Sequence, residues 1–287
     1  MKSEIVVLLA GIVVAGSQAS AGSPHERSRT MVESYPLEEV SGVRLLVVDT
    51  LWGGIRVRAV AGDEVRMKAV RSDTAESAAW LERAESEVSL DVTVEPGRLE
   101  LFVDGPWRSR ERRGEWAETG HLGYEVAYDF ELEVPVGTAL DLKTVGRGAI
   151  ELVGTDGLHR VSNVTGDVRL DGVAGSGRFE SVSGSVSGSF IESPSKESGF
   201  KTVSGDLEVA FPADLSAELS VSAKWGEIWS AFPLEPIASL PAVSERRGGR
   251  LRIESNGGGR FRVGRGGAEL RFETLSGEIR IGRSEAR

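Results

Sequence analysis

The chain has 287 residues, no cysteine and a formal net charge of −10. Because cysteine is absent, disulfides, thiol chemistry and a cysteine-linked lipid anchor are excluded. The acidic balance disfavours a phosphate-binding face, so we expect no nucleic-acid partner.

The first 21 residues have the features of a secretory signal peptide. Lys2 precedes an apolar run from Ile5 to Ala15, and Ala19 and Ala21 match a cleavage site. The run is short for a membrane span, which needs roughly 20 apolar residues. We predict an exported protein, periplasmic, cell-surface or extracellular, with no integral membrane segment after cleavage; an uncleaved anchor is the alternative. Residues 22–35 are polar and are predicted to form a flexible leader.

Residues 36–139 are predicted to form a strand meander with one peripheral helix. Alternating apolar residues indicate three consecutive strands at 43–48, 55–60 and 65–70. An Ala- and Glu-rich stretch predicts a helix over about 73–87, with Asp73 or Thr74 as its N-cap. Renewed alternation predicts further strands at 88–94, 99–103 and 126–134.

A stretch between these strands, residues 104–123, has no alternation and is predicted to be a loop. Tryptophan and arginine are favoured anchors of protein interfaces, so the loop is a candidate contact for a partner. The other interpretation is a solvated hairpin tip whose tryptophans cover a neighbouring strand. The candidate contact residues are Trp107, Arg108, Arg110, Arg112, Arg113 and Trp116.

The C-terminal half repeats a short pattern, seen most clearly in Lys-Thr-Val-Ser-Gly-Asp-Leu-Glu-Val at 201–209. A strand leads to a glycine, a polar residue follows, and apolar alternation resumes. The copies align on Gly148, Gly166, Gly184, Gly205, Gly226 and Gly277. Their steps are 18, 18, 21, 21 and 51 residues, and residues 255–263 are predicted to be a weak copy within the last step. A period of roughly 20 residues is typical of units that stack on their neighbours.

We therefore predict an all-β fold in which short strand repeats stack as a β-solenoid. Each glycine is either a hairpin turn or a bend between strands of the solenoid. One repeat-built domain is expected over 36–283, with the repeat stack at 140–283 and a tail at 284–287. The exposed ends of such a stack need covering, and the predicted helix or the proline-rich stretch 233–241 is expected to do this.

These repeats, together with Val-Val-Asp-Thr-Leu-Trp-Gly-Gly-Ile-Arg-Val at 47–57, resemble the bacterial DUF4097 family of adhesin-like proteins, also called toastrack-like. The resemblance covers about residues 38–283. It implies a right-handed, β-helix-like stack of strands in a cell-envelope protein. It implies no catalytic residues.

The sequence contains few patterns that are typical of catalytic or metal-binding sites. The three histidines, His25, His121 and His159, are far apart and have no metal-ligand spacing, so no metal and no cofactor are expected. Polar residues follow the repeat glycines, and four of them are acidic: Asp167, Asp206, Glu227 and Glu278. Such a row suits either glycoside hydrolysis or ordinary turn formation, and turn formation is favoured.

We expect a non-catalytic protein that binds or scaffolds an unidentified envelope protein or glycan. One alternative is a carbohydrate-active β-helix enzyme that uses the acidic row. The other alternative is an extracytoplasmic component of envelope-stress signalling.

Overall fold

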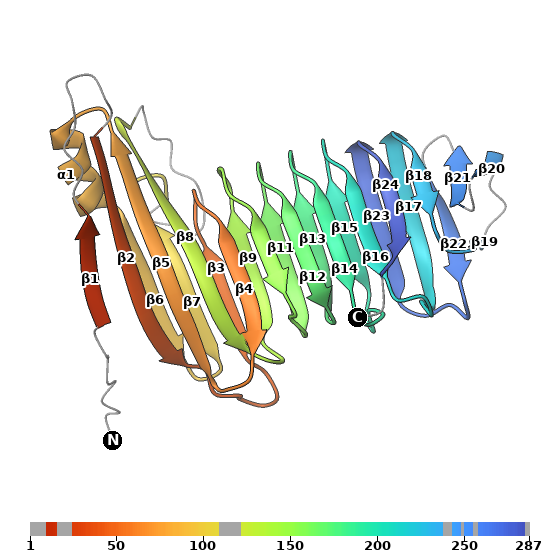
Figure 1. Cartoon of the computed structure of the whole chain (residues 1–287), viewed down its shortest axis with the longest axis horizontal. Coiled ribbons are helices and arrows are strands. Elements are labelled where there is room, and N and C mark those ends of the chain that lie inside the picture. Colours follow the sequence, from red (N-terminus) through yellow and green to blue (C-terminus); the bar gives the residue numbers. More distant parts are fainter. Residues whose placement is uncertain are drawn as a thin grey trace.

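The computed structural model describes residues 10–15, 25–108, 122–237, 243–247, 250–254 and 258–284. This part of the chain consists of strands and one helix, α1 (Ala78–Glu87). The strands form two long sheets, here called sheet 1 and sheet 2, which lie face to face along an elongated stack (Figure 1).

Sheet 1 begins with strands from the N-terminal half and ends with a C-terminal hairpin. Its spatial order is β1 (Ala10–Ala15), β2 (His25–Pro36), β5 (Glu64–Ala75), β8 (Tyr124–Pro135), β4 (Ile55–Val60), β10 (Ile150–Val153), β12 (Val168–Val173), β14 (Val186–Phe190), β16 (Leu207–Phe211), β24 (Ile279–Arg283), β18 (Ile228–Ser230), β21 (Arg250–Glu254) and β20 (Val243–Arg247).

Sheet 2 lies alongside sheet 1, and its strands are also given from the N-terminal end of the stack. Its spatial order is β6 (Ser89–Glu95), β7 (Arg98–Asp104), β3 (Leu45–Asp49), β9 (Ala139–Thr144), β11 (Leu158–Asn163), β13 (Ser176–Ser181), β15 (Ser198–Thr202), β23 (Glu269–Ser276), β17 (Ala217–Trp225), β22 (Gly259–Val263) and β19 (Glu235–Pro236).

Each repeat is one coil of this stack. A strand of sheet 2 runs to the glycine, the chain bends there, and the next strand lies in sheet 1; β11 and β12 form one such coil. Successive coils pair in parallel, as in Val161 with Phe179 in sheet 2 and Val168 with Val186 in sheet 1. The two large, mostly parallel sheets are consistent with the predicted β-helix-like stack, and the glycine is a bend between strands rather than a hairpin turn.

The bend requires glycine because neighbouring coils approach too closely for any side chain. A Cβ placed on Gly166 would lie 1.8 Å from the carbonyl oxygen of Gly148. The same contact is 2.2 Å from Gly184 to Gly166 and 2.2 Å from Gly205 to Gly184. These glycines therefore form a continuous column. Glycine recurs in the repeat because the backbones of adjacent coils are in close contact there.

A second column lies beside the glycines and satisfies their carbonyl groups. In five coils, a buried polar side chain donates a hydrogen bond to a glycine carbonyl of the adjacent coil. Its members are Thr144 to Gly53 (3.0 Å), Asn163 to Gly148 (2.9 Å), Ser181 to Gly166 (2.8 Å), Thr202 to Gly184 (2.8 Å) and Thr274 to Gly205 (3.2 Å). The Thr, Ser or Asn three residues before Gly166, Gly184, Gly205 and Gly277 thus has a structural cause, and Thr144 has the same role four residues before Gly148.

The space between the sheets is filled by a ladder of phenylalanines. Phe200 stacks between Phe179 and Phe272, with ring centroids 5.4 and 4.7 Å away. From the opposite sheet, Phe190 and Phe211 meet it edge-on. All five are at most 1% exposed, so this ladder forms the centre of the repeat core.

The order of the coils in space differs from their order in the sequence. Gly277 lies against Gly205, and Gly226 lies against Gly277. The coil β23–β24 is therefore inserted between β15–β16 and β17–β18. The weak copy predicted at 255–263 is wrong, because β22 pairs antiparallel with β17 and so does not continue the parallel repeat.

Two predictions for the N-terminal half are also wrong. The expected meander is divided between the sheets: β3 is in sheet 2, whereas β4 and β5 are in sheet 1 with β8 between them. The reason is that Gly53 is a coil bend, against which Gly148 packs. The expected flexible leader at 22–35 instead contains β2, which pairs with β5 along its whole length because Met31 and Tyr35 pack against the core.

Helix α1 covers the N-terminal end of the stack (Figure 1) and begins later than predicted. Its N-cap is Ser77, since Asp73 and Thr74 belong to β5, which stays paired through Ala75. The proline-rich stretch supplies β19, which covers an edge strand of sheet 2 at the other end of the stack. Both expected end covers are therefore present.

Candidate functional site

The first two candidate residues of the predicted contact loop, Trp107 and Arg108, are buried. Trp107 is 4% exposed and meets Trp52 edge-on, with ring centroids 5.2 Å apart. Arg108 is 5% exposed and donates to Asp49 at 2.5 Å. Both side chains anchor the start of the loop on the stack and are not presented to a partner, which corrects their predicted role. The other candidates, Arg110, Arg112, Arg113 and Trp116, lie outside the described residues.

Asp206, Glu278 and Glu227 occupy the same position in three adjacent coils, and Ser185 separates them from Asp167. Asp167 accepts a hydrogen bond from the backbone N–H of Ser185 at 3.0 Å. Asp206 accepts one from the backbone N–H of Glu278 at 2.8 Å. These carboxylates therefore link each bend to the next coil, which is the turn-forming role that the sequence favoured.

Of the histidines, His25 lies in β2, His121 lies outside the described residues, and His159 is buried in the core at 2% exposed. Its ring lies 6.2 Å from that of Phe179. Within the described ranges, no group of three or more His, Asp or Glu residues could hold a metal ion. No helix there is long and apolar enough to cross a membrane.

Burial lowers the pKa of His159 to about 4, whereas the unfolded side chain titrates near 6.5. The folded state thus resists protonation, and its stability is complete above pH 6.5 and declines as the pH falls toward 4. Between pH 7 and pH 4, we expect His159 to cost the protein about 3 kcal/mol of unfolding free energy.

The check is urea unfolding at both pH values for the wild type and His159→Leu. Leucine suits the position because Leu140 is its partner in the adjacent strand. The variant should lose about 3 kcal/mol less than the wild type; equal losses would show that the histidine is not buried in its neutral form.

A hollow with a volume of about 650 Å³ lies on the outer face of sheet 1, across β14, β16, β24 and β18. We call it the trough. Its floor consists of small residues in neighbouring strands. These are Ala210, Gly282 and Ala231, and Gly188 lies beside them in β14, in register with Val209. Because alternate residues of a strand point outward, three small outward-facing residues side by side leave a depression that crosses the strands.

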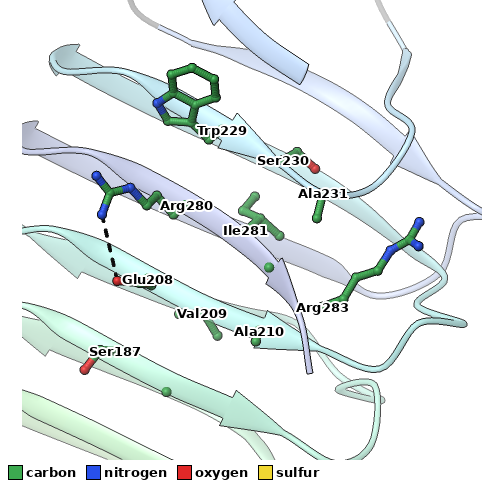
Figure 2. Close-up of a pocket in the computed structure, with 12 residues that line it drawn as sticks. Ser187, Glu208, Val209, Ala210, Trp229, Ser230, Ala231, Arg280, Ile281 and Arg283 are labelled. Carbon is green, nitrogen blue, oxygen red and sulfur yellow. Dashed lines mark ion pairs between the residues drawn. The ribbon is translucent and has the colours of Figure 1, made fainter. Parts of the chain in front are cut away.

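Larger side chains line the trough (Figure 2). One wall is a register row in which Ser187 pairs with Glu208, Glu208 with Arg280, and Arg280 with Trp229. The Glu208 and Arg280 side chains form an ion pair at 4.0 Å. Arg283 stands at the end of β24, with its guanidinium 5.3 Å from the centre of the Phe232 ring.

Sequence reasoning missed the trough. Its strands are not consecutive, since β24 is inserted between β16 and β18. The available signal was the pair of small outward-facing residues, Ala210 and Gly282, at strand positions where some other strands of sheet 1 carry charged residues, such as Glu133 and Arg58.

No protein-family model and no curated protein matches the chain. Its fold is similar to that of a putative cell adhesion protein from Clostridium sporogenes, with 12% identity and a TM-score of 0.40 over 91% of this chain and 100% of that one. It is also similar to a putative adhesin from Bacteroides fragilis, with 12% identity and a TM-score of 0.40 over 88% of this chain and 96% of that one. At this identity the likeness concerns the fold alone.

Proposed function

We propose that the chain is an exported cell-envelope protein that binds or scaffolds an envelope component without chemical turnover. The observation that carries this proposal is the trough, an open depression on a rigid stack, lined by an aromatic ring and charged side chains. Ligand sites combine apolar surface with a few polar groups in this way. The signal-peptide pattern and the repeats that resemble the DUF4097 family support the envelope location.

The polar groups of the stack also favour binding over turnover. Two carboxylates of the acidic row, Asp167 and Asp206, hold backbone N–H groups of the next coil. A catalytic acid or base must instead be within reach of a substrate proton. In the trough itself, Glu208 is paired with Arg280.

The test is sedimentation of purified residues 22–287 with an insoluble envelope fraction. Ala210→Tyr places a large side chain on the trough floor, while the core side of β16 is untouched. Its matched control is Ser220→Tyr, which adds the same side chain to the outer face of sheet 2. We expect the wild type and the control to co-sediment and Ala210→Tyr to lose about tenfold in affinity. Equal retention of all three, or of none, would refute the proposal.

A further inference from the structure

At the α1 end of the stack, β6 is the last strand of sheet 2 among the described residues (Figure 1). Leu90, Val92 and Val94 are on the core side of β6, because their partners in β7 are all at most 1% exposed. Val92 and Val94 are nevertheless 36% and 40% exposed. The cover over the core therefore stops at β6, and apolar surface is left open there.

The backbone of β6 is open along the same edge. In an antiparallel pair, only alternate residues bond to the partner strand. Residues 96–97 form a two-residue turn, so Glu95 and Arg98 are the first bonded pair. Leu90, Val92 and Val94 therefore direct their N–H and C=O groups to the side where the described part of sheet 2 has no further strand. An open row of backbone groups is a template for another strand.

Sheet 1 extends beyond this edge. Past the coil of β3 and β4, the described residues add β7 and β6 to sheet 2, whereas sheet 1 continues through β8, β5 and β2. Met31 and Tyr35 are on the core side of β2, since they pair with fully buried residues of β5, yet they are themselves only half-buried. Helix α1 covers the other half of β2, where its Glu85 pairs with Arg27 and Arg29.

A ledge therefore remains at this end of the stack. We use this name for the open edge of β6, with Val92 and Val94, and the overhanging part of β2, with Met31 and Tyr35. A strand added to β6 would gain main-chain hydrogen bonds from its edge and would pack its inward side chains beneath β2. If β6 of a second copy paired antiparallel there, both copies of β2 would have to occupy the same space. The ledge thus suits a single extended segment.

The side chains around the ledge define what this segment must carry. On the core side, it would lie beside Leu90, Val92 and Val94, which favour apolar residues. On the outer side, it would lie beside Asp91 and Glu95, which are both exposed. Opposite charges directly across two strands attract, and like charges repel. An alternation of apolar and basic residues therefore fits both sides.

We propose that the ledge binds an extended segment of a partner protein, in which apolar and basic residues alternate, as an added strand of sheet 2. This inference goes beyond the proposed function. The trough lies on the outer face of sheet 1 across β14, β16, β24 and β18, and it takes no part in this contact.

The experiment measures binding of residues 22–287 to a labelled peptide by fluorescence anisotropy. The peptide has the sequence of β4, Ile-Arg-Val-Arg-Ala-Val at 55–60, which alternates in the required way. One control peptide carries Arg56→Glu and Arg58→Glu, and the other is N-methylated throughout, which removes its backbone donors. We expect both control peptides to bind at least about tenfold more weakly.

Two variants of the protein locate the site. Val92→Pro removes an N–H group that faces the open edge and is not needed for pairing with β7. We expect it to weaken binding of the β4 peptide about tenfold. The control is Ala210→Tyr, which alters the trough and should bind this peptide as the wild type does. Circular dichroism confirms that each variant is folded, and the N-methylated peptide tests the edge on the wild type without any variant.

Several results would overturn this inference and leave the function proposed for the trough intact. They are no binding of the β4 peptide at roughly 1 mM, equal binding of either control peptide, and unchanged binding by folded Val92→Pro. Dimerisation of the wild type that Val92→Pro abolishes would assign the edge to a second copy instead. A loss of peptide binding in Ala210→Tyr would place the peptide in the trough and would also overturn the inference.

Discussion

Gly184→Ala is expected to destabilise the protein far more than a methyl group added to a glycine of the stack that has open space around it. The added Cβ would lie 2.2 Å from the carbonyl oxygen of Gly166 and 2.5 Å from its carbonyl carbon. Both atoms belong to the backbone of the adjacent coil, so no side chain can move aside. The coils must separate locally, and the hydrogen bond from Thr202 to the Gly184 carbonyl is disturbed as well. We expect a loss of about 3 kcal/mol in unfolding free energy.

The matched control is Gly199→Ala, in β15 of the same stack. A Cβ there meets nothing closer than the Arg178 Cγ at 3.9 Å. This variant should stay within about 0.5 kcal/mol of the wild type, or gain slightly because the unfolded chain loses freedom. Urea unfolding of both variants measures the difference. Similar losses at the two positions would show that coil contact is not what selects glycine at the bends.

Asp73→Asn is expected to have the second large effect. Asp73 is 2% exposed and accepts from the Arg71 Nε at 2.7 Å. Arg71 also donates to the carbonyl oxygens of Val88 at 2.8 Å and Ala84 at 2.9 Å, at the C-terminus of α1. Without this carboxylate, the buried guanidinium loses the acidic group that it contacts directly, and Glu85 attracts it only from a longer distance. Breaking a buried pair in this way costs about 3–5 kcal/mol.

An exposed pair between β5 and the adjacent strand β8 provides the comparison. Arg66 lies 3.3 Å from Glu133, and both side chains are largely in solvent. Glu133→Gln should therefore cost less than about 1 kcal/mol. Thermal unfolding followed by circular dichroism compares the two variants. If Asp73→Asn were as mild as Glu133→Gln, then Arg71 would not depend on the pair, and α1 would be held by its apolar contacts alone.

The local sequence pattern of the repeats correctly predicted the coils of the stack. The repeat glycines and the alternation after them report contacts between adjacent copies, and each is visible within nine residues such as 201–209. The strands predicted at 88–94 and 99–103 correspond to β6 and β7, which form a hairpin, and their alternation is local for the same reason. The stretch 47–57 contains the same bend, but its alternation alone fits either a meander or a coil, so the sheets could not be assigned.

Contacts between distant segments could not be predicted. The insertion of β23 and β24 depends on how the coils fit together, which the spacing of glycines does not reveal. The polar segment at 22–35 gave no sign of β2, because its inward side chains include Arg27 and Arg29. These pair with Glu85 of α1, a partner more than 50 residues away.

The candidate site illustrates the same limit. The composition of the loop at 104–123 suggested a contact surface, yet Trp107 and Arg108 are buried because their partners, Trp52 and Asp49, lie in a distant strand and bend. The trough was missed for the opposite reason, because its residues do not stand out in the sequence. Ala210 and Gly282 are inconspicuous in the sequence, and the depression exists only because the inserted strand β24 brings them side by side.

The most direct test of the account is a single incubation of residues 22–287 with an envelope polysaccharide fraction, in which both bound protein and new reducing ends are measured over time. We predict saturable binding with no increase in chain ends. An increase in chain ends that is lost in Asp206→Asn would contradict the account and assign the acidic row to catalysis.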